Sequence, residues 1–403
     1  MLARHDGVVV LVAGAVPGER VRARVEKKSR NLIWASVEEI VEPSPARRAP
    51  EADPACGGAD YLHIDYTAQL GIKSEVIDDA FRRIGKMTID RVAVEPSPEH
   101  GYRMRARLHV VDGRAGFFLE GTHTLCDATA TRQLSPGAVD AVHGVLARLN
   151  GARGVTSVVI SENARATERV VHLEPGTDAI AIDIAGLDVT GITAPEGRGG
   201  VRVLAGKATV TDRAGDLFTA ESPIPADTAW TRHAASFFQG NRYLTGALVA
   251  HVLNNVAGTR VLDLYSGVGL FAVACAARGH TVTAVEGDLV SGSDLAINAT
   301  PYGSNLRVER AAVEDAMRKL GDVRPDTVIV NPPRTGLSPD ALSGVTGLRA
   351  SAVIYVSCDP ATLARDAQKL VAAGYTLASA RAFDLFPNTA HVETVATFTR
   401  ADR

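Results

Sequence analysis

One cysteine, Cys358, stands where a reactive thiol is expected. Residues 354–356 before it form an apolar run typical of a buried strand, and Asp359 and Pro360 after it suit the N-cap and first turn of a helix. A thiol at a helix N-terminus has its thiolate favoured, and the thiolate is the nucleophilic form. A small buried apolar cysteine is the alternative, and we assign that role to Cys275 inside an alanine-rich segment. We predict that Cys358 is a nucleophile.

An acidic residue, Glu393, lies in the otherwise apolar run over residues 391–398. A buried carboxyl group is costly unless it has a partner or a function. The alternative is an exposed glutamate on an edge strand, and the periodicity of the run leaves both interpretations open. If it is buried near Cys358, Glu393 could serve as the base that covalent catalysis needs for a later proton removal.

A glycine-rich turn follows the strand predicted at residues 260–264. Gly267 and Gly269 let the backbone approach a ligand, and the helix predicted after them presents its N-terminus to the ligand's negative end. Glu286 ends the next predicted strand, where a carboxylate could accept both hydroxyls of a ribose. The spacing also fits a loose dinucleotide fingerprint, and a tight turn without a ligand is a third alternative. The acidic Asp263 favours S-adenosylmethionine, which has no pyrophosphate.

Two further polar motifs follow predicted strands. Asn331 and Arg334 flank two prolines after the apolar residues 328–330, and Cys358 follows residues 354–356. Open α/β sheets bind ligands beyond the carboxyl ends of their strands. We therefore predict that three strand ends bring the glycine turn, an amide and a thiol to one crevice.

The elements that must position these groups change in character along the chain. Residues 229–403 alternate between strand and helix signals, which predicts a doubly wound, Rossmann-like α/β domain ending in two antiparallel strands; Asn241 is expected to cap a helix to about residue 255. Residues 43–228 begin with a linker and a helix and are then mostly strand-like. Residues 1–42 predict a small β-barrel of the OB type, with a hairpin turn at Pro17-Gly18.

Composition limits the class of protein. The chain of 403 residues has a net charge of −3, so any nucleic-acid contact must come from local basic patches. No apolar run is long enough to span a bilayer. The four cysteines are far apart without C-x-x-C spacing, which suits free thiols in a reducing compartment better than disulfides. We expect a cytoplasmic monomer.

Together the motifs resemble those of the RNA 5-methyluridine methyltransferases of the TrmA/RlmD type, which are class I enzymes dependent on S-adenosylmethionine. The matching segments are residues 238–241, 263–269, 331–334, 356–360 and 386–393. The resemblance implies that Cys358 adds to C6 of a uracil, that C5 then takes the methyl group, and that Glu393 removes the C5 proton. The residues implied to hold the cofactor are Gln239, Tyr265, Gly267, Gly269, Glu286 and Asn331, with Asn331 also beside the target base.

The amino-terminal parts resemble the longer members of that family. Residues 16–21 are similar to the TRAM module, an RNA-binding β-barrel. The resemblance does not include the module's first strand, so we expect the natural start to lie upstream of Met1. Arg103, Arg105 and Arg107 alternate along a predicted strand and are expected to meet RNA phosphates from one face. A solvated strand face is the alternative. Arg334 is also expected to contact RNA. The module favours ribosomal RNA as substrate, with transfer RNA left open.

Two departures from the family pattern stand out. Longer members often hold an iron–sulfur cluster on four cysteines, whereas here Cys56 and Cys126 are the two that match, with Ala59 and Pro50 near the other positions. Two thiolates cannot replace four ligands, so we predict no cluster and no metal. Asn331 stands where the family usually has aspartate. An amide can still accept from uracil N3–H and donate to O4, but it carries no negative charge.

Three other functions share parts of this pattern. Amino-group methyltransferases also use Asn-Pro-Pro, but they normally place an aromatic residue at the position of Arg334 and need neither Cys358 nor Glu393. RNA cytosine-5 methyltransferases have a cysteine in the loop occupied here by residues 331–333. A non-catalytic RNA-binding factor on the same fold is the third alternative, and the joint presence of Cys358 and Glu393 argues against it.

Overall fold

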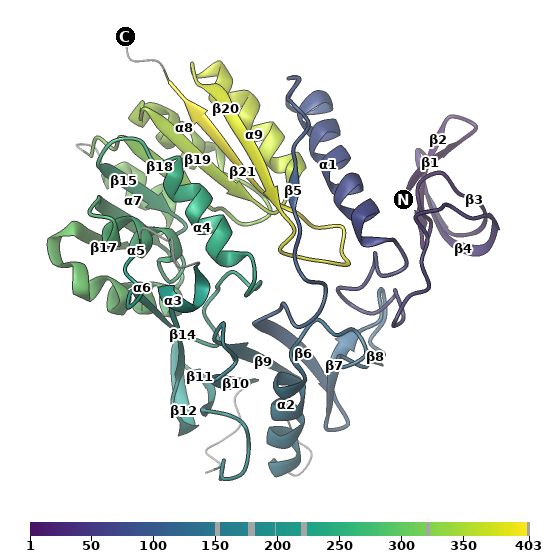
Figure 1. Cartoon of the computed structure of the whole chain (residues 1–403), viewed down its shortest axis with the longest axis horizontal. Helices are drawn as coiled ribbons and strands as arrows, with labels where there is room; N and C mark the ends of the chain where they lie inside the picture. The colour runs from purple at the N-terminus through teal and green to yellow at the C-terminus, as the bar shows by residue number, and fades with distance from the viewer. Residues whose placement is uncertain (150–153, 176–181, 198, 219–223, 320–322, 401–403) are drawn as a thin grey trace.

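The computed structural model describes residues 1–149, 154–175, 182–197, 199–218, 224–319 and 323–400. Three main sheets succeed one another along the chain (Figure 1). A small sheet lies at the N-terminus, a larger one follows in the middle region, and the third fills the C-terminal half. The doubly wound α/β prediction for that last part is confirmed.

The C-terminal sheet has eight strands in the order β17-β16-β15-β18-β19-β21-β20-β5. Neighbouring strands are parallel except where β21 runs against both β19 and β20. The strands are β5 (Val94–Glu95), β15 (Arg260–Leu264), β16 (Thr281–Glu286), β17 (Leu306–Arg310), β18 (Thr327–Val330), β19 (Ala352–Ser357), β20 (Thr376–Phe383) and β21 (Glu393–Thr399).

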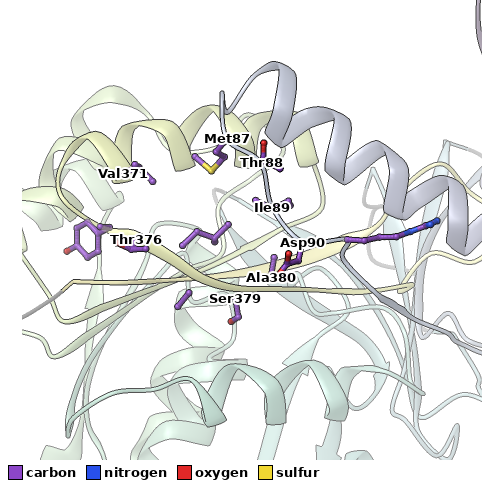
Figure 2. A pocket seen from close by; sticks show the side chains of 12 residues that line it. Met87, Thr88, Ile89, Asp90, Val371, Thr376, Ser379 and Ala380 are labelled. Atoms are coloured by element: carbon purple, nitrogen blue, oxygen red, sulfur yellow. The ribbon is translucent and has the colours of Figure 1, made fainter.

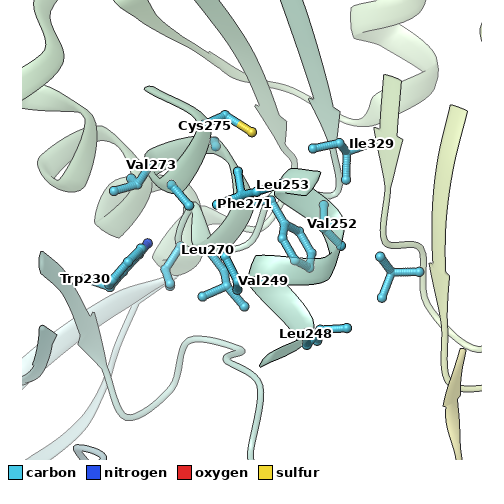
Figure 3. Close-up of a cluster of buried hydrophobic side chains, with 14 of the residues drawn as sticks. Trp230, Leu248, Val249, Val252, Leu253, Leu270, Phe271, Val273, Cys275 and Ile329 are labelled. Atoms are coloured by element: carbon cyan, nitrogen blue, oxygen red, sulfur yellow. The ribbon is translucent and has the colours of Figure 1, made fainter. Parts of the chain in front are cut away.

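Helices cover both faces of this sheet because its central strands are apolar on both sides. On one face, Ile329 and Ile354 of the sheet pack in a hydrophobic cluster with three helices, α4 (Thr245–Asn254), α5 (Leu270–Ala277) and α6 (Leu289–Ala299). The 3₁₀ helix η1 (Thr300–Asn305) directly follows α6. Figure 3 shows Val249, Val252 and Phe271 of this cluster packed together. The opposite face is covered by α1 (Tyr66–Arg83), α7 (Val313–Lys319), α8 (Pro339–Leu348) and α9 (Pro360–Ala372).

The helix predicted from Asn241 begins later than expected. The Asn241 carboxamide oxygen accepts hydrogen bonds from the backbone N–H groups of Tyr243 and Leu244, at 3.0 and 3.1 Å, so it caps a preceding turn. The α-helix α4 starts only at Thr245. The buried amide nitrogen of Asn241 donates to the carbonyl of Leu385 at 3.2 Å, which ties this turn to the segment before β21.

The middle region forms a seven-stranded sheet in the order β12-β11-β10-β9-β6-β7-β8. Its strands are β6 (Arg105–Val111), β7 (Arg114–Phe118), β8 (Leu125–Cys126), β9 (Ser157–Glu162), β10 (Arg169–Glu174), β11 (Gly191–Glu196) and β12 (Gly200–Gly206). A two-stranded sheet of β13 (Thr209–Arg213) and β14 (Ala229–His233), with the short α3 (Ala214–Leu217), leads to the C-terminal sheet.

One helix of this region, α2 (Pro136–Arg148), lies where strands were predicted. The Ser135 hydroxyl caps it by accepting from the Ala138 N–H at 3.2 Å, and Pro136 opens its first turn. Its apolar residues, among them Val142 and Val145, pack on the middle sheet. The helix was not predicted because the surrounding residues favour strands, and the helix-start signal at Ser135 and Pro136 was not weighed against them.

The N-terminal sheet has the order β1-β2-β4-β3, from β1 (Leu2–His5), β2 (Val8–Ala13), β3 (Arg20–Lys28) and β4 (Leu32–Glu42). The predicted hairpin at Pro17-Gly18 is wrong, because β2 pairs with β1 and, in parallel, with β4. The tight hairpin turn is at Asp6-Gly7, where both φ angles are positive, at 49° and 78°. Within residues 1–42 the sheet is open, with β1 and β3 at its edges, so the predicted barrel is not closed by these strands.

Elements of residues 43–228 pack directly on the C-terminal sheet. The helix α1 lies along α9, and β5 extends the sheet beyond β20 (Figure 1). Lys73 of α1 forms a buried ion pair with Asp384 at 2.6 Å and donates to the Phe386 carbonyl at 3.1 Å. Asn388 accepts from Arg48 at 2.8 Å and from Gln69 at 3.0 Å. The segment between β20 and β21 is thus held by residues from the first quarter of the chain, while the domain boundaries themselves remain a prediction.

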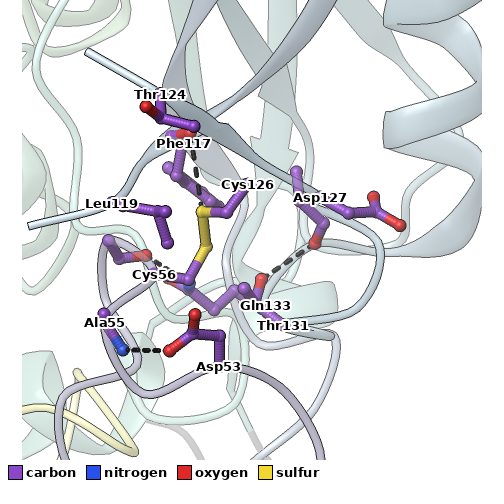
Figure 4. The surroundings of a disulfide bond; sticks show 12 residues. Asp53, Ala55, Cys56, Phe117, Leu119, Thr124, Cys126, Asp127, Thr131 and Gln133 are labelled. Carbon is purple, nitrogen blue, oxygen red and sulfur yellow. Dashed lines mark hydrogen bonds between the residues drawn. A yellow bond between two sulfur atoms is a disulfide. The ribbon is translucent and has the colours of Figure 1, made fainter. Parts of the chain in front are cut away.

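The cysteines of the middle region do not stay free. Cys56 and Cys126, 70 residues apart, form a disulfide with a Cα–Cα distance of 5.8 Å (Figure 4). The expectation of four free thiols is therefore wrong for this pair, because spacing along the chain does not reveal which loops the fold brings together. The family resemblance had matched the same two cysteines to ligands of one iron–sulfur cluster, so it had placed them close together. The expected absence of a cluster stays a prediction.

Among the described residues, no helix is both long and apolar enough to cross a membrane.

Candidate active site

A cavity of 560 Å³ lies at the carboxyl ends of β15, β16, β18 and β19. Strands with continuous apolar runs end there, and the first polar residue after each strand projects from the edge of the sheet. The predicted site residues that line this cavity are Gln239, Tyr265, Gly267, Glu286, Asn331, Arg334, Cys358 and Glu393. The structure therefore brings together residues that span more than 150 positions of sequence.

Cys358 is placed by the end of β19 and the start of α9. Asp359 is the N-cap of that helix, and its carboxylate accepts from the Thr362 N–H at 2.8 Å, as predicted. Burial raises the pKa of the Cys358 thiol and the nearby Glu393 raises it further, whereas the Arg334 guanidinium lowers it. The net direction is opposite to the one expected from a helix N-terminus, because desolvation of the thiolate outweighs the effect of the Arg334 guanidinium.

Glu393 is the first residue of β21, which lies inside the sheet between β19 and β20. The alternative of an exposed glutamate on an edge strand is excluded, since the side chain is 3% exposed. Burial raises the pKa of this carboxyl to about 8. A carboxyl with a pKa near neutrality can both take and release a proton at working pH, as a general base must. Its role as the base remains a prediction.

The glycine turn has an unusual backbone. Tyr265, Gly267 and Gly269 all have positive φ angles, of 60°, 58° and 92°. Such a conformation is costly for a tyrosine, and residues held in it cluster at ligand sites. Gly269 does not line the cavity. Its carbonyl accepts from the Trp230 indole N–H at 3.2 Å, and an added Cβ would lie 2.7 Å from Leu295, so this glycine permits close packing rather than ligand contact.

Glu286 closes the turn from the neighbouring strand. One carboxylate oxygen accepts from the Gly267 N–H and the other from the Asp288 N–H, both at 2.7 Å. Burial raises the pKa of this carboxyl, and these backbone donors partly offset that effect. Each oxygen keeps a second lone pair, so the carboxylate can still accept hydroxyl groups from a ligand in the cavity.

Asn331 and Arg334 form the side of the cavity next to Cys358. The Asn331 N–H donates to the Leu264 carbonyl at 3.3 Å, which holds the loop after β18 against β15. Arg334 reaches across to the segment before β21, where its guanidinium contacts the Nε2 atom of His391 at 3.0 Å. The guanidinium thereby links the loop after β18 to the segment before β21.

The three arginines of the middle region lie outside the cavity. Their alternation is as predicted, since the intervening Met104 and Ala106 are buried. Each guanidinium also has a protein acceptor: Gln133 for Arg103, the carbonyls of Ala234 and Ala235 for Arg105, and Glu174 for Arg107. Phosphate contact stays a prediction. Arg105 holds one edge of the cavity in place, because it donates to the carbonyl of Ala235 and Ala235 lines the cavity.

Sequence reasoning missed several lining residues. They are Ala235, Phe237, Asp288, Ser291 and Phe386. Phe237 was detectable as an aromatic residue two positions before Gln239, and its side chain is 58% exposed. Asp288 caps α6 by accepting from the Ser291 N–H at 2.8 Å, a local cap signal that was overlooked.

A second hollow, of 620 Å³, lies between residues 87–91 and β20 (Figure 2). Its ionisable lining groups are Asp90, Arg91 and Tyr375, without a thiol or an imidazole in that lining. It therefore lacks the free thiol and the fully buried carboxyl that share the first cavity, which remains the candidate active site.

Comparison with known proteins agrees with this geometry. The family model described as tRNA (Uracil-5-)-methyltransferase matches residues 226–401. The 23S rRNA (uracil(1939)-C(5))-methyltransferase RlmD of Aromatoleum aromaticum is 32% identical, over 99% of this chain and 96% of that protein. The enzyme of the same name from Pseudomonas putida is 30% identical, over 98% of this chain and 89% of that protein.

A solved structure extends the similarity to three dimensions. The tRNA (uracil-54, C5)-methyltransferase of Pyrococcus abyssi, in complex with S-adenosyl-L-homocysteine, is 26% identical with a TM-score of 0.75. The alignment covers 97% of this chain and 95% of that one, so it includes the middle and N-terminal sheets as well as the site. With relatives above 30% identity over nearly its whole length, the chain belongs to the RNA uracil-5-methyltransferase family.

Proposed function

We propose that this protein transfers the methyl group of S-adenosylmethionine to C5 of a uridine in RNA, with Cys358 as nucleophile and Glu393 as base. The observation that carries the proposal is the shared cavity. A free thiol and a buried carboxyl with a pKa of about 8 line it together with a glycine turn. An amino-group methyltransferase would need neither group.

The residues at the glycine turn fit the cofactor. A volume of 560 Å³ suits a ligand of drug-like size. A Cβ on Gly267 would meet only the Phe237 carbonyl, at 3.7 Å, so the space in front of this backbone is open to a ligand. Glu286 would accept the ribose hydroxyls, and Gln239 and Tyr265 would flank them. When bound, S-adenosylmethionine supplies an electrophilic methyl group.

Cys358 and Asn331 would prepare the target base. The thiolate adds to C6 of the uracil, and the electron pair of the C5–C6 double bond moves toward O4, which makes C5 nucleophilic. The Asn331 amide can accept from N3–H and donate to O4, where the charge develops. Methyl transfer to C5 then leaves a saturated ring bonded to the sulfur of Cys358.

Glu393 would complete the reaction. Its carboxylate takes the C5 proton, the electron pair reforms the C5–C6 double bond, and the bond between C6 and sulfur breaks to restore the thiolate. A base with a pKa of about 8 is half ionised at that pH, so elimination should accelerate as pH rises toward it. The same carboxyl, once protonated, no longer opposes formation of the thiolate.

For the RNA, we propose ribosomal RNA first and transfer RNA second. Two relatives at 30% identity or more carry a 23S rRNA name, while the solved structure at 26% identity carries a tRNA name. Parallel assays with transcripts of a 23S rRNA fragment and of a tRNA decide between them, and the preferred transcript should show the higher kcat/KM.

The covalent step can be tested with RNA containing 5-fluorouridine and labelled S-adenosylmethionine. Fluorine at C5 cannot leave as a proton, so the protein should become trapped on the RNA. Cys358→Ala should abolish this adduct and lower methylation of normal RNA by about three orders of magnitude or more. Glu393→Gln should accumulate the adduct even on ordinary uridine.

The matched control is Cys275→Ala, since Cys275 is the other free cysteine and lies buried in the core of α5. That variant should still form the adduct. Methylation at C5 that persists in Cys358→Ala would overturn the proposal, and so would methylation at a ring nitrogen, an exocyclic amine or cytosine C5.

A further inference from the structure

The contact between Arg334 and His391 defines the protonation state of the histidine. The Nη2 atom of Arg334 lies 3.0 Å from Nε2 of His391. An arginine guanidinium donates hydrogen bonds and has no acceptor, so Nε2 must be the acceptor. His391 is therefore neutral in this arrangement, with its proton on Nδ1.

The contact with His391 is the hydrogen bond that the structure shows for Arg334 among the described residues. Within the described parts of the chain, no carboxylate forms a salt bridge with Arg334, although most arginines of the structure have one. Its guanidinium instead contacts the imidazole of His391 and lines the same cavity as the thiol of Cys358. At the thiol it is the positive charge that opposes the effects of burial and of Glu393.

We propose that His391 is a positioning residue that holds the Arg334 guanidinium against the Cys358 sulfur while its own ring is neutral, and releases it when the ring is protonated. This inference rests on the proposed function, because it concerns the activation of the same nucleophile. A protonated ring has no lone pair at Nε2 and places a second positive charge beside Arg334. The thiolate then loses its cationic partner.

The charges around His391 define the range of pH in which this switch acts. The charged groups that act on its ring electrostatically are Arg334, Lys73, Asp359 and Arg103, and of these Arg334 contacts it. Burial, and after it Arg334, lowers the pKa of His391 from its usual value of 6.5. The ring is consequently neutral at pH 7 and becomes charged only in the acid range, where the contact with Arg334 is lost.

The test measures the reactivity of the Cys358 thiol in the resting protein, without RNA or cofactor. Cys275 is fully buried and Cys56 is bonded to Cys126, so Cys358 is the accessible thiol among the four cysteines, all of them within described segments. The rate of alkylation by iodoacetamide is followed from pH 5 to 9 without reductant, and the modified peptide is identified by mass spectrometry.

Two variants separate positioning from mere packing. His391→Leu removes the acceptor, and its alkylation rate at pH 7 should fall by up to about tenfold, which corresponds to one pKa unit in the thiol. His391→Gln keeps an acceptor oxygen that does not titrate, so the rate at pH 7 should return to within about twofold of the natural protein. His143→Gln is the matched control, because His143 lies in the helix α2, which packs on the middle sheet. It should leave the pH profile of alkylation unchanged.

The pH profile gives an independent criterion. In the natural protein the logarithm of the rate should fall with unit slope as thiolate is lost and then steepen below the pKa of His391. His391→Gln should keep unit slope throughout. Equal profiles for His391→Leu and the natural protein would overturn the inference, and so would an acid-side steepening that survives in His391→Gln, even if His391→Leu fails to fold. Absence of any RNA adduct in the natural protein would instead overturn the proposed function alone.

Discussion

The buried charges at the junction of the sheets differ from those in the cavity. At the junction each charge has a partner: Lys73 pairs with Asp384 at 2.6 Å, and Arg232 with Asp212 at 2.9 Å, all four fully or almost fully buried. In the cavity Glu393 is equally buried, but within the described residues no cation forms a salt bridge with it. Its pKa rises to about 8 as a result.

The difference separates structural from functional carboxyl groups. In a buried pair, burial raises the pKa of Asp384 and lowers that of Lys73, but the charge of each partner opposes the effect on the other. The pair holds two elements in register, and removing one partner leaves the other stranded. An unpaired buried carboxyl is held neutral near physiological pH and is free to exchange a proton with a substrate. Burial alone does not reveal which role a carboxyl has, whereas burial together with its neighbours does.

The largest expected loss of stability follows from breaking a junction pair. Lys73→Met leaves Asp384 buried without its cation, which should lower the free energy of unfolding by about 3–5 kcal/mol. Urea denaturation with an unchanged m-value measures this loss. Arg48→Ala would not serve here, because Arg48 is partly exposed and has several partners.

The double variant Lys73→Met/Asp384→Leu is the control for that loss. Replacing both charges with apolar groups removes the stranded carboxylate, so much of the stability should return. A double variant as unstable as Lys73→Met alone would show that packing around α1, rather than the stranded charge, accounts for the loss.

An effect of comparable size and opposite sign is expected at Glu393. Its pKa is raised from 4.5 to about 8 in the folded state, so the fold retains a proton that the unfolded chain releases above pH 4.5. Stability from this group is fully present below that pH and is lost as pH rises through about 8. Each pKa unit corresponds to about 1.4 kcal/mol. Glu393→Gln should therefore match the natural protein at pH 4 and exceed it by a few kcal/mol at pH 9.

Thermal unfolding at the two pH values checks this expectation. The paired Asp384→Asn variant provides the contrast, because it should be less stable than the natural protein at pH 9, where it loses the carboxylate that pairs with Lys73. A Glu393→Gln variant that is no more stable at pH 9 than the natural protein would contradict the assignment of an unpaired, neutral carboxyl in the cavity.

The smallest effect belongs to exposed pairs. Arg82 and Asp79 lie 2.7 Å apart on α1, with side chains 63% and 43% exposed. Solvent screens such a pair, so Arg82→Ala should change the free energy of unfolding by less than about 0.5 kcal/mol. A loss comparable to that in Lys73→Met would mean that pairing, rather than burial, determines the cost.

Local signals in the sequence were sufficient for much of the site. The apolar runs of β15, β16, β18 and β19 and the cap at Asp359 are determined by neighbouring residues, so their positions could be predicted. Because parallel strands end at a common edge, the meeting of Cys358 with the glycine turn also followed. Glu393 could not be assigned in this way, since its burial depends on β20 lying outside β21.

Other features depend on contacts between distant segments. No local pattern shows that β5 joins the C-terminal sheet, that Cys56 meets Cys126, or that Arg334 meets His391. The direction of the Cys358 pKa was missed for the same reason. The helix N-terminus is visible in the sequence, whereas the degree of burial is a property of the assembled cavity.

The anchoring of the segment between β20 and β21 has a consequence for synthesis of the protein. Arg48 and Gln69 bond to Asn388, and Lys73 to Asp384, across more than 300 residues of chain. Domains fold from the amino end as the ribosome delivers them, but these contacts cannot form until residues 384–393 have emerged. Arg48, Gln69 and Lys73 therefore form these contacts only after the last strands of the sheet have been synthesised. An incomplete nascent chain has no assembled cavity and cannot modify the RNA around it.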